Sequence, residues 1–307
     1  MRKLRVYIIG KRTLERTLAF AKGVISSDNE WDTKVVPIKE FLSNGFPNDL
    51  NIGDAVATWG ILRGTGLLLN EAKKRKIDYF FMDHGYFKSF DENEIWYRIV
   101  KNNHSCTSLK FVNKKRWESF FSKSNKIFPW KNQYQCGPNI LVCPPTNAIM
   151  WYQKINYDWT SFIVKKLKEI LPKNKHKNIK IRPKPNEPIV DNIGNLIRLE
   201  HNKIDTSLED DLDNSYCVIA YNSNVALQAT LKGIPVITSE ISPCKVISYK
   251  IEDLTKIEND LIKPFNQEPP YRKDLLYWLA NNQWNLNEIG NGTAWKMLTQ
   301  NERKELS

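Results

Sequence analysis

The chain has 307 residues, of which 41% are hydrophobic and 26% are charged. These values exclude a disordered or low-complexity protein and leave room for two domains with separate cores. The net charge of +12 favours an anionic partner such as nucleic acid, an acidic membrane surface or an anionic small substrate, with a general bias toward lysine as the alternative explanation.

Targeting signals and cysteines indicate where the protein works. The basic start of the chain leads into only a short apolar run, and no apolar run reaches 18 residues, so we expect neither a signal peptide nor a transmembrane segment. The five cysteines include no CxxC pair, and Cys143 and Cys217 lie within apolar strand patterns. We therefore expect a cytoplasmic protein.

The first half of the chain alternates between two kinds of segment. Apolar runs predict strands at residues 4–10, 33–38, 54–59 and 78–82, and helical spacing predicts helices at 13–24 and 67–75. This alternation is typical of a parallel sheet with crossover helices.

A basic and aromatic segment at residues 87–135 interrupts this pattern. Lysines and arginines alternate there with aromatic residues that include Trp96, Tyr97, Trp117 and Phe121. Such a segment suits DNA binding through phosphate contacts and base stacking, and equally suits a helical region with an aromatic core. Gly137-Pro138 follows it and predicts a domain boundary.

The second half resumes the alternation of strands and helices. We predict strands at residues 139–143, 178–182, 217–220 and 236–240, helices at 158–171 and 208–212, and terminal helices at 275–279 and 281–284. The chain therefore divides into domains at residues 1–136 and 137–307, the first carrying the basic and aromatic insert and the second carrying the terminal helices.

The segment from Tyr221 to Ile237 predicts an anion site. A buried strand runs into Tyr221, Asn222, Ser223 and Asn224, where a helix begins. The free N–H groups of a helix N-terminus suit a phosphate or diphosphate.

Three further residues follow predicted strands of the same half. Arg182 and Lys184 follow one strand, and Glu240 ends another. Ligands of open α/β sheets bind beyond the carboxyl ends of strands, so we expect the two cations to contact a diphosphate and Glu240 to accept sugar or ribose hydroxyls. The alternative is that Arg182 and Lys184 are solvated loop charges.

Two strand ends of the first half carry candidate catalytic groups. Trp59 ends one predicted strand, and Asp83 and His84 follow another. Either Asp83 or His84 is suited to deprotonate an acceptor hydroxyl as a general base, and the sequence does not choose between them. The histidines and carboxylates show no metal-ligand spacing, so no metal site is predicted.

These motifs together resemble GT-B glycosyltransferases, and more closely the Kdo-transferase-like group of capsule-polysaccharide enzymes. That group has a W-G pair, matched by Trp59-Gly60, and an E-D-G-F-x-R-S motif, matched by residues 83–89 (DHGYFKS). Its R-P-H-P motif corresponds to residues 182–185 (RPKP), and its S-N-V-x-x-E-A-L-x-x-G-x-P-V motif to residues 223–236. The segment 283–289 (QWNLNEI) also fits.

The resemblance implies a fold and a set of roles. It implies an α/β protein of GT-B type, with two Rossmann-like domains and a cleft between them, the first binding the acceptor and the second the nucleotide-sugar. The acceptor contacts expected in the first domain are Trp59, Arg63, Tyr86, Lys88, Lys114, Lys115 and Arg116. The family's catalytic acid aligns with His84, and its R-P-H-P histidine is Lys184, which leaves room for a donor other than CMP-Kdo, such as UDP-glucose, without a metal cofactor.

The acceptor has three competing interpretations. The basic charge and the aromatic insert resemble phage enzymes that glucosylate 5-hydroxymethylpyrimidines. This resemblance implies double-stranded DNA as a partner and, for a phage-encoded protein, the host cytoplasm as its location. The alternative enzyme is a capsule or lipopolysaccharide sugar transferase that uses a CMP- or UDP-sugar. The third interpretation is an inactive protein that binds a nucleotide-sugar or nucleic acid.

Overall fold

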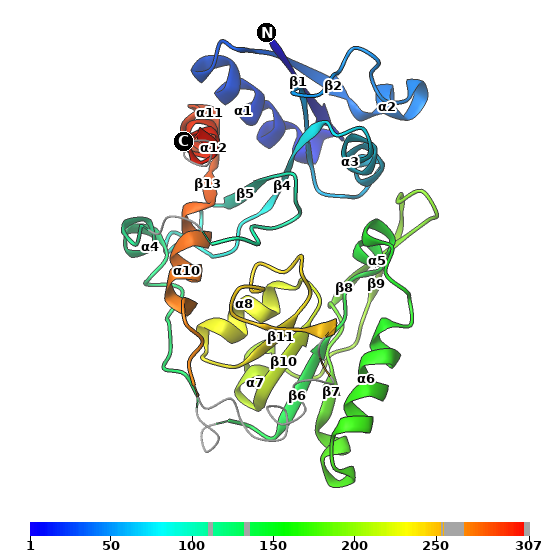
Figure 1. Ribbon diagram of the computed structural model, residues 1–307, viewed down its shortest axis with the longest axis vertical. Coiled ribbons are helices and arrows are strands. Elements are labelled where there is room, and N and C mark those ends of the chain that lie inside the picture. The colour runs from blue at the N-terminus through cyan, green and yellow to red at the C-terminus, as the bar shows by residue number, and fades with distance from the viewer. Residues whose placement is uncertain (110–112, 132–135, 253, 255–266, 304–307) are drawn as a thin grey trace. The chain divides into compact units, whose positions relative to one another are not determined.

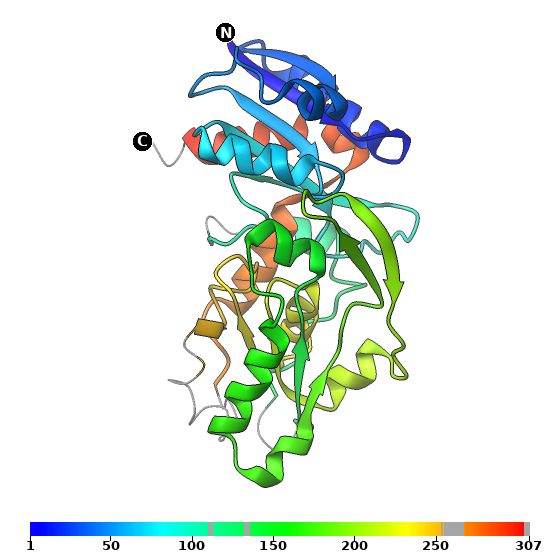
Figure 2. The same ribbon diagram turned by 90° about the vertical axis from the view of Figure 1, so that its right-hand side faces the viewer.

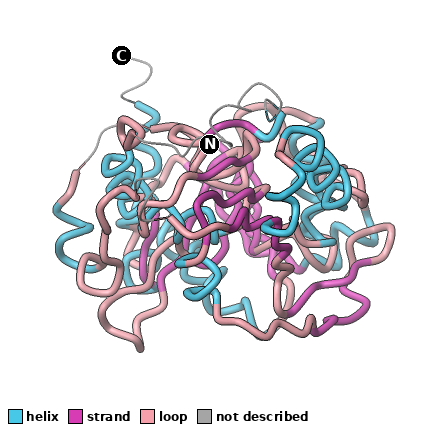
Figure 3. The backbone as a smooth tube through the Cα atoms, turned by 90° about the horizontal axis from the view of Figure 1, so that it is seen from below, coloured by secondary structure: helices cyan, strands magenta, loops and turns pink. Residues whose placement is uncertain are grey.

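A computed structural model describes residues 1–109, 113–131, 136–252, 254 and 267–303. The chain is an α/β protein whose residues form two compact units (Figure 1). Unit 1 comprises Met1–His104, Val190–Leu196 and Asn281–Ser307, and unit 2 comprises Ser105–Ile189 and Ile197–Ala280. Helices and strands alternate along much of both units, and Figure 3 shows the backbone coloured by secondary structure.

Unit 1 is built on a six-stranded sheet with the order β13-β5-β4-β3-β1-β2. Its elements are β1 (Arg2–Ile8), α1 (Lys11–Ser27), β2 (Trp31–Pro37), α2 (Ile38–Asn44), β3 (Ala55–Trp59), α3 (Thr65–Lys74), β4 (Asp78–His84), β5 (Trp96–Lys101), β13 (Gln283–Asn285), α11 (Leu286–Gly290) and α12 (Thr293–Arg303).

The first four strands of unit 1 are parallel, as the alternating pattern predicts. Val6 of β1 lies between Val35 of β2 and Ala57 of β3. β5 and β13 are antiparallel to their neighbours. For β5 the reason is that the loop from β4 holds no crossover helix, which a parallel neighbour would need. The predicted α/β class and parallel pairing are confirmed, and β5 lies within the segment that the sequence predicted to be irregular.

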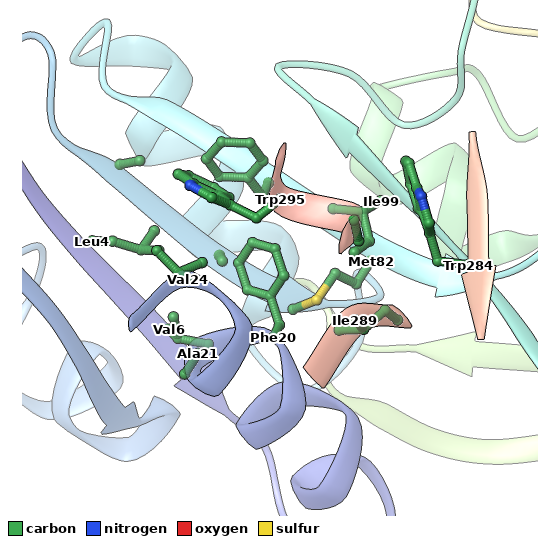
Figure 4. Close-up of a cluster of buried hydrophobic side chains, with 14 of the residues drawn as sticks. Leu4, Val6, Phe20, Ala21, Val24, Met82, Ile99, Trp284, Ile289 and Trp295 are labelled. Atoms are coloured by element: carbon green, nitrogen blue, oxygen red, sulfur yellow. The ribbon is translucent and has the colours of Figure 1, made fainter. Parts of the chain in front are cut away.

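The C-terminal segment of the chain completes the core of unit 1. Trp295 of α12 is 2% exposed, and its ring lies 5.1 Å from Phe80 and 5.9 Å from Phe20. Figure 4 shows Trp295 and Trp284 among side chains from α1, β1 and β4. Burying side chains of this size contributes about 2–3 kcal/mol each, so the end of the chain is part of the first unit's core.

Two sequence predictions about the C-terminal segment differ from the structure. Residues 281–284 were predicted to be helical, but Gln283–Asn285 is a strand that pairs with β5. The predicted division at residue 136 also differs from the two compact units, since Asn281–Ser307 clusters with Met1–His104. The physical reason is that Trp284 and Trp295 pack against β1, β4 and α1, which no local pattern reveals.

Unit 2 is built on a five-stranded parallel sheet with the order β12-β11-β10-β6-β7. Its elements are α4 (Lys115–Phe120), β6 (Asn139–Cys143), α5 (Asn147–Gln153), α6 (Trp159–Ile170), the 3-10 helix η1 (Lys173–Asn178), β7 (Ile179–Ile181), β8 (Asn186–Val190), β9 (Leu196–His201), α7 (Leu208–Asp213), β10 (Ser215–Ala220), α8 (Asn224–Leu231), β11 (Val236–Thr238), β12 (Tyr249–Lys250) and α10 (Arg272–Asn281). β8 and β9 form a separate hairpin (Figure 2).

The core of unit 2 follows from its apolar strands. β6 and β10 are almost fully buried, and they pack against Ile163 and Leu167 of α6. Cys143 and Cys217 are buried and all five cysteines are free, so the predicted core positions of these two are confirmed. Among the described residues, no helix is long and apolar enough to cross a membrane.

Arg272 closes the C-terminal end of α8. Its side chain is buried and donates to the carbonyl oxygens of Thr230 at 2.8 Å and Leu231 at 3.1 Å, and to that of Phe128 at 2.8 Å. The last carbonyls of a helix lack intrahelical partners and carry a partial negative charge. The guanidinium therefore satisfies them and fixes α8 against α10.

The contact between α1 and α11 yields a stability prediction. A Cβ at Gly23 would overlap the Ile289 carbonyl oxygen, whereas a Cβ at Gly290 would meet only the Ala19 Cβ, at 3.8 Å. We expect Gly23→Ala to lower the free energy of unfolding by about 2 kcal/mol or more, because backbone must move, and Gly290→Ala to leave it unchanged or raised by up to about 1 kcal/mol. Urea denaturation checks this, and equal effects would contradict the packing of α11 on α1.

Candidate functional site

The sheet of unit 1 has a topological switch point between β1 and β3. The chain leaves β1 through α1 to reach β2 on one side, and β3 then adds to the other side. Crevices beyond the carboxyl ends of such strands are the usual ligand sites of open α/β sheets. Trp59 is the last residue of β3 and therefore lies at this edge.

Four side chains gather at this edge, and we name them the Trp59 cluster. The Trp59 ring lies 5.5 Å from the His84 ring and 5.3 Å from the Tyr97 ring, both edge-on. The Arg16 guanidinium lies 4.6 Å from the centre of the Trp59 ring and 5.1 Å from that of Tyr97. The structure thus brings together Trp59 and His84, which the sequence predicted as site residues. It adds Arg16 and Tyr97, to which the sequence assigned no role in the site.

Asp83 and His84 differ in what their side chains can do. Asp83 Oδ2 accepts a hydrogen bond from Arg98 at 3.1 Å, and its Oδ1 accepts the His84 backbone N–H at 2.8 Å. The Arg98 side chain is only 7% exposed. Both carboxylate oxygens of Asp83 are therefore engaged within the protein, while His84 is exposed at the strand end. The geometry favours His84 as the group that meets a substrate.

Gln283 holds the loop that follows His84. Its side-chain oxygen accepts the backbone N–H groups of Tyr86 at 2.5 Å and Phe87 at 3.0 Å, and its amide donates to the Phe87 carbonyl at 3.3 Å. A Cβ at Gly85 would lie 2.7 Å from the same Gln283 oxygen. The close approach of Gln283 leaves no room for a side chain at position 85, which explains the glycine there. Gln283, a residue of β13, thereby fixes the backbone beside His84.

The remaining acceptor candidates of unit 1 are dispersed. Tyr86 is 7% exposed and its ring lies 5.3 Å from the Arg98 guanidinium, so its phenol ring packs in the interior instead of lining an open site. Lys88 and Arg63 are exposed. Arg63 has a positive φ of 59° in the turn before α3.

The sheet of unit 2 has its own switch point between β6 and β10. The chain leaves β6 through α5 and α6 to reach β7 on one side, and β10 then adds to the other side. Residues 144–147 follow β6, and residues 221–224 follow β10. These two loops therefore border the position where an open α/β sheet binds its ligand.

The loop after β10 opens α8 in the predicted manner. The Ser223 hydroxyl accepts the Val225 N–H at 3.2 Å and caps the helix. The Tyr221 carbonyl is held by the N–H and hydroxyl of Ser239, at 3.1 Å and 2.7 Å. Asn222 and Asn224 are half-buried around the cap. These contacts give a rigid helix start at the sheet's carboxyl edge.

Three predicted donor contacts have different surroundings. Arg182 donates to Asp211 Oδ2 at 2.5 Å and to the Thr206 carbonyl at 3.0 Å, and its side chain is 10% exposed. The charge of Arg182 is therefore neutralised within unit 2, whereas the sequence predicted that Arg182 contacts a diphosphate. Lys184 is exposed. Glu240 pairs with Lys250 and Lys245, whose hydrogen bonds hold the pKa of its carboxyl below the usual range.

The basic and aromatic segment is largely a packing element. Trp96 and Tyr97 belong to β5, and Trp117 and Phe121 are buried, so these rings are unavailable for stacking on a base. Lys114, Lys115 and Arg116 begin α4, which belongs to unit 2 and not to the unit of the Trp59 cluster. Arg116 donates to the Ala280 carbonyl at 3.1 Å, and Lys114 pairs with Glu118 at 3.3 Å.

Sequence reasoning assigned no site role to Arg16 or Arg98, and it noted Gln283 only as part of the matching segment 283–289. Arg16 lies within a helix that was predicted from its spacing alone, and Gln283 acts on a loop about 200 positions away in the chain. Arg98 could have been found by asking which cation faces Asp83 across the next strand, since the two are paired in register.

Comparisons with known proteins give distant structural likenesses only. KpsC of Thermosulfurimonas dismutans is similar in two structures, a beta Kdo 2,4 transferase and a beta Kdo 2,7 transferase. The first has 12% identity and a TM-score of 0.46 over 94% of this chain and 97% of that chain. The second has 11% identity and a TM-score of 0.49 over 98% and 100%. MnaA of S. aureus, in a co-structure with UDP, has 12% identity and a TM-score of 0.31 over 100% and 97%. No protein-family model and no curated protein matches the chain.

Metal-ligating side chains do not gather in the described part of the chain. No group of three histidine, cysteine, aspartate or glutamate side chains there is placed to hold an ion. His104 is a buried histidine beneath the Asp83–Arg98 pair, stacked on Phe81 with ring centres 4.5 Å apart. Burial lowers the pKa of His104 to about 3, and the nearby Arg98 charge acts in the same direction.

His104 yields a pH prediction. Its pKa is depressed from 6.5 to about 3 in the fold, so the unfolded chain binds the proton more tightly and stability falls as the pH drops below 6.5. At pH 5 the loss amounts to about 2 kcal/mol. We expect His104→Gln to lose this dependence between about pH 7 and pH 5 in urea denaturation.

The matched control is His201→Gln, because His201 is an exposed histidine of β9. This variant keeps the pH dependence of the unaltered chain. A pH dependence in His104→Gln equal to that of the unaltered chain would show that His104 is accessible to protons in the fold.

Proposed function

We propose that the chain is a glycosyltransferase of the GT-B kind that uses a nucleotide-sugar donor. The observation that supports this is the position of four motifs. Trp59 ends β3, Asp83 and His84 end β4, residues 182–185 follow β7, and residues 221–224 follow β10. The strands β3, β4, β7 and β10 each pair in parallel with at least one neighbour. Each motif therefore lies at the carboxyl edge of a parallel part of a sheet, where ligands bind.

The proposed donor site lies on unit 2. The start of α8 offers a partial positive charge to the diphosphate, and Lys184 is an exposed cation after β7. Arg182 acts indirectly, because its ion pair with Asp211 fixes the loop that carries Lys184. UDP-glucose and CMP-Kdo are the donors to test first, since the resemblance implies a CMP-sugar and Lys184 favours a diphosphate.

The proposed chemistry places the general base on unit 1. An imidazole nitrogen of His84 takes the proton of the acceptor hydroxyl as the oxygen attacks the anomeric carbon of the donor. The bond between that carbon and the phosphate oxygen breaks, and the nucleotide leaves with the electron pair. Asp83, held by Arg98, positions the His84 backbone through its N–H group.

We propose a saccharide acceptor in preference to DNA. The DNA hypothesis rests on aromatic residues available for stacking, and Trp117 and Phe121 are 4% and 0% exposed. Two cations at the start of α4 are engaged with Glu118 and the Ala280 carbonyl. An acidic glycan explains the net charge of +12 as well as DNA does.

The proposal predicts the activity of His84 variants. Transfer is measured by mass spectrometry with UDP-glucose and CMP-Kdo as donors, and acidic oligosaccharides and hydroxymethylcytosine duplex DNA as acceptors. We expect His84→Ala to lower the transfer rate by about 10²–10⁴-fold through loss of the base, with donor affinity unchanged. Asp83→Asn, which keeps the shape of the side chain, lowers it less.

The control variant is His201→Ala, which removes an exposed histidine of unit 2 and leaves transfer unchanged. Absence of turnover with every donor, while nucleotide binding persists, would indicate an inactive binding protein instead. Transfer to duplex DNA in preference to the oligosaccharides would replace the proposed acceptor with DNA.

A further inference from the structure

Arg16 lies where a substrate of unit 1 would bind. It belongs to α1, the helix that leaves β1 at the switch point, and its guanidinium covers the rings of Trp59 and Tyr97. The Trp59 ring also contacts His84. The cation and the proposed base are therefore neighbours on one aromatic ring.

Arg16 differs from the other arginines that stack on aromatic rings in the described part of the chain. Arg2 donates to the Gly53 carbonyl, Arg75 to Glu71, and Arg98 to Asp83. Arg116 and Arg272 each donate to a backbone carbonyl oxygen. Each of these five thus holds an oxygen of the protein as well as an aromatic ring.

Within the same described residues, Arg16 donates no hydrogen bond and forms no ion pair. None of its nitrogen atoms is among the buried atoms that lack a partner, and the residue is partly exposed, so its N–H groups face solvent. The cation–π contacts hold the guanidinium over the two rings without using its N–H groups. The result is a preorientated cation with its hydrogen-bonding capacity unused.

We propose that Arg16 binds an anionic group, a carboxylate or a phosphate, on the saccharide whose hydroxyl is presented to His84. This inference rests on the proposed function and adds the chemical class of the acceptor. A guanidinium forms paired hydrogen bonds with the two oxygens of either group. The contacts of the guanidinium with the Trp59 and Tyr97 rings hold the bound acid close to His84, which contacts the same Trp59 ring.

The test is ligand-observed NMR by saturation transfer, which detects weak binding and needs no turnover. The probes are glucuronic acid, glucose 6-phosphate and glucose, which separate a carboxylate from a phosphate and both from a neutral sugar. We expect the unaltered chain to bind at least one acidic probe about 10-fold more tightly than glucose. Arg16→Gln abolishes this preference, and Arg16→Lys keeps part of it, since a charge remains but the paired geometry is lost.

Arg2→Gln is the matched control. Arg2 stacks on Trp31 at 4.0 Å away from the Trp59 cluster, so this variant retains the preference for the acidic probe. Circular dichroism of each variant establishes folding, and Arg16→Lys preserves the test if Arg16→Gln does not fold.

Three results would overturn the inference. They are equal binding of acidic and neutral probes, an acid preference that survives in Arg16→Gln, and displacement of the acidic probe by hydroxymethylated duplex DNA at lower concentration than by any acidic sugar. A failure of the proposed function is distinct from these, because it leaves Arg16-dependent acid binding intact while no donor is turned over.

Discussion

The pairing of β4 with β5 determines which chemistry is available at the carboxyl edge of unit 1. It places Asp83 opposite Arg98, and the ion pair between them occupies one carboxylate oxygen of Asp83. A buried guanidinium requires a partner, since an uncompensated buried charge costs several kcal/mol. The Arg98 Nε already lacks a partner, so Asp83 is committed to Arg98. The adjacent His84 is then the residue of the pair whose side chain is exposed to substrate.

The same edge depends on the end of the chain. β13 extends the sheet next to β5, and from it Gln283 fixes the loop after His84. Asn285 of β13 donates to Glu94 at 2.6 Å, and Glu94 in turn accepts from Trp96 at 2.9 Å. Trp295 anchors this segment in the core. The geometry beside His84 therefore depends on the packing of the C-terminal helices.

The sequence predicts those parts of this structure that depend on local pattern. β1, β3, β4, β6 and β10 follow from buried apolar runs. A parallel sheet then implies that Trp59, His84 and residues 221–224 lie at carboxyl edges. β13 and the packing of Trp295 were not predicted, because three strand residues and one tryptophan give no local signal for a partner far along the chain. Arg182 is instructive, since its motif suggests a phosphate ligand while Asp211, 29 residues later, neutralises it.

The function proposed for this chain requires that the carboxyl edge of unit 2 at residues 221–224 binds the nucleotide of a sugar donor. Hydrogen exchange with mass spectrometry, with and without UDP or CMP, tests this most directly. We expect slower exchange in peptides that cover residues 221–231, because a phosphate bound at the start of α8 stabilises this helix against local opening, and unchanged exchange in peptides that cover residues 11–27. Protection confined to residues 11–27 or 59–75, with none at 221–231, would contradict it.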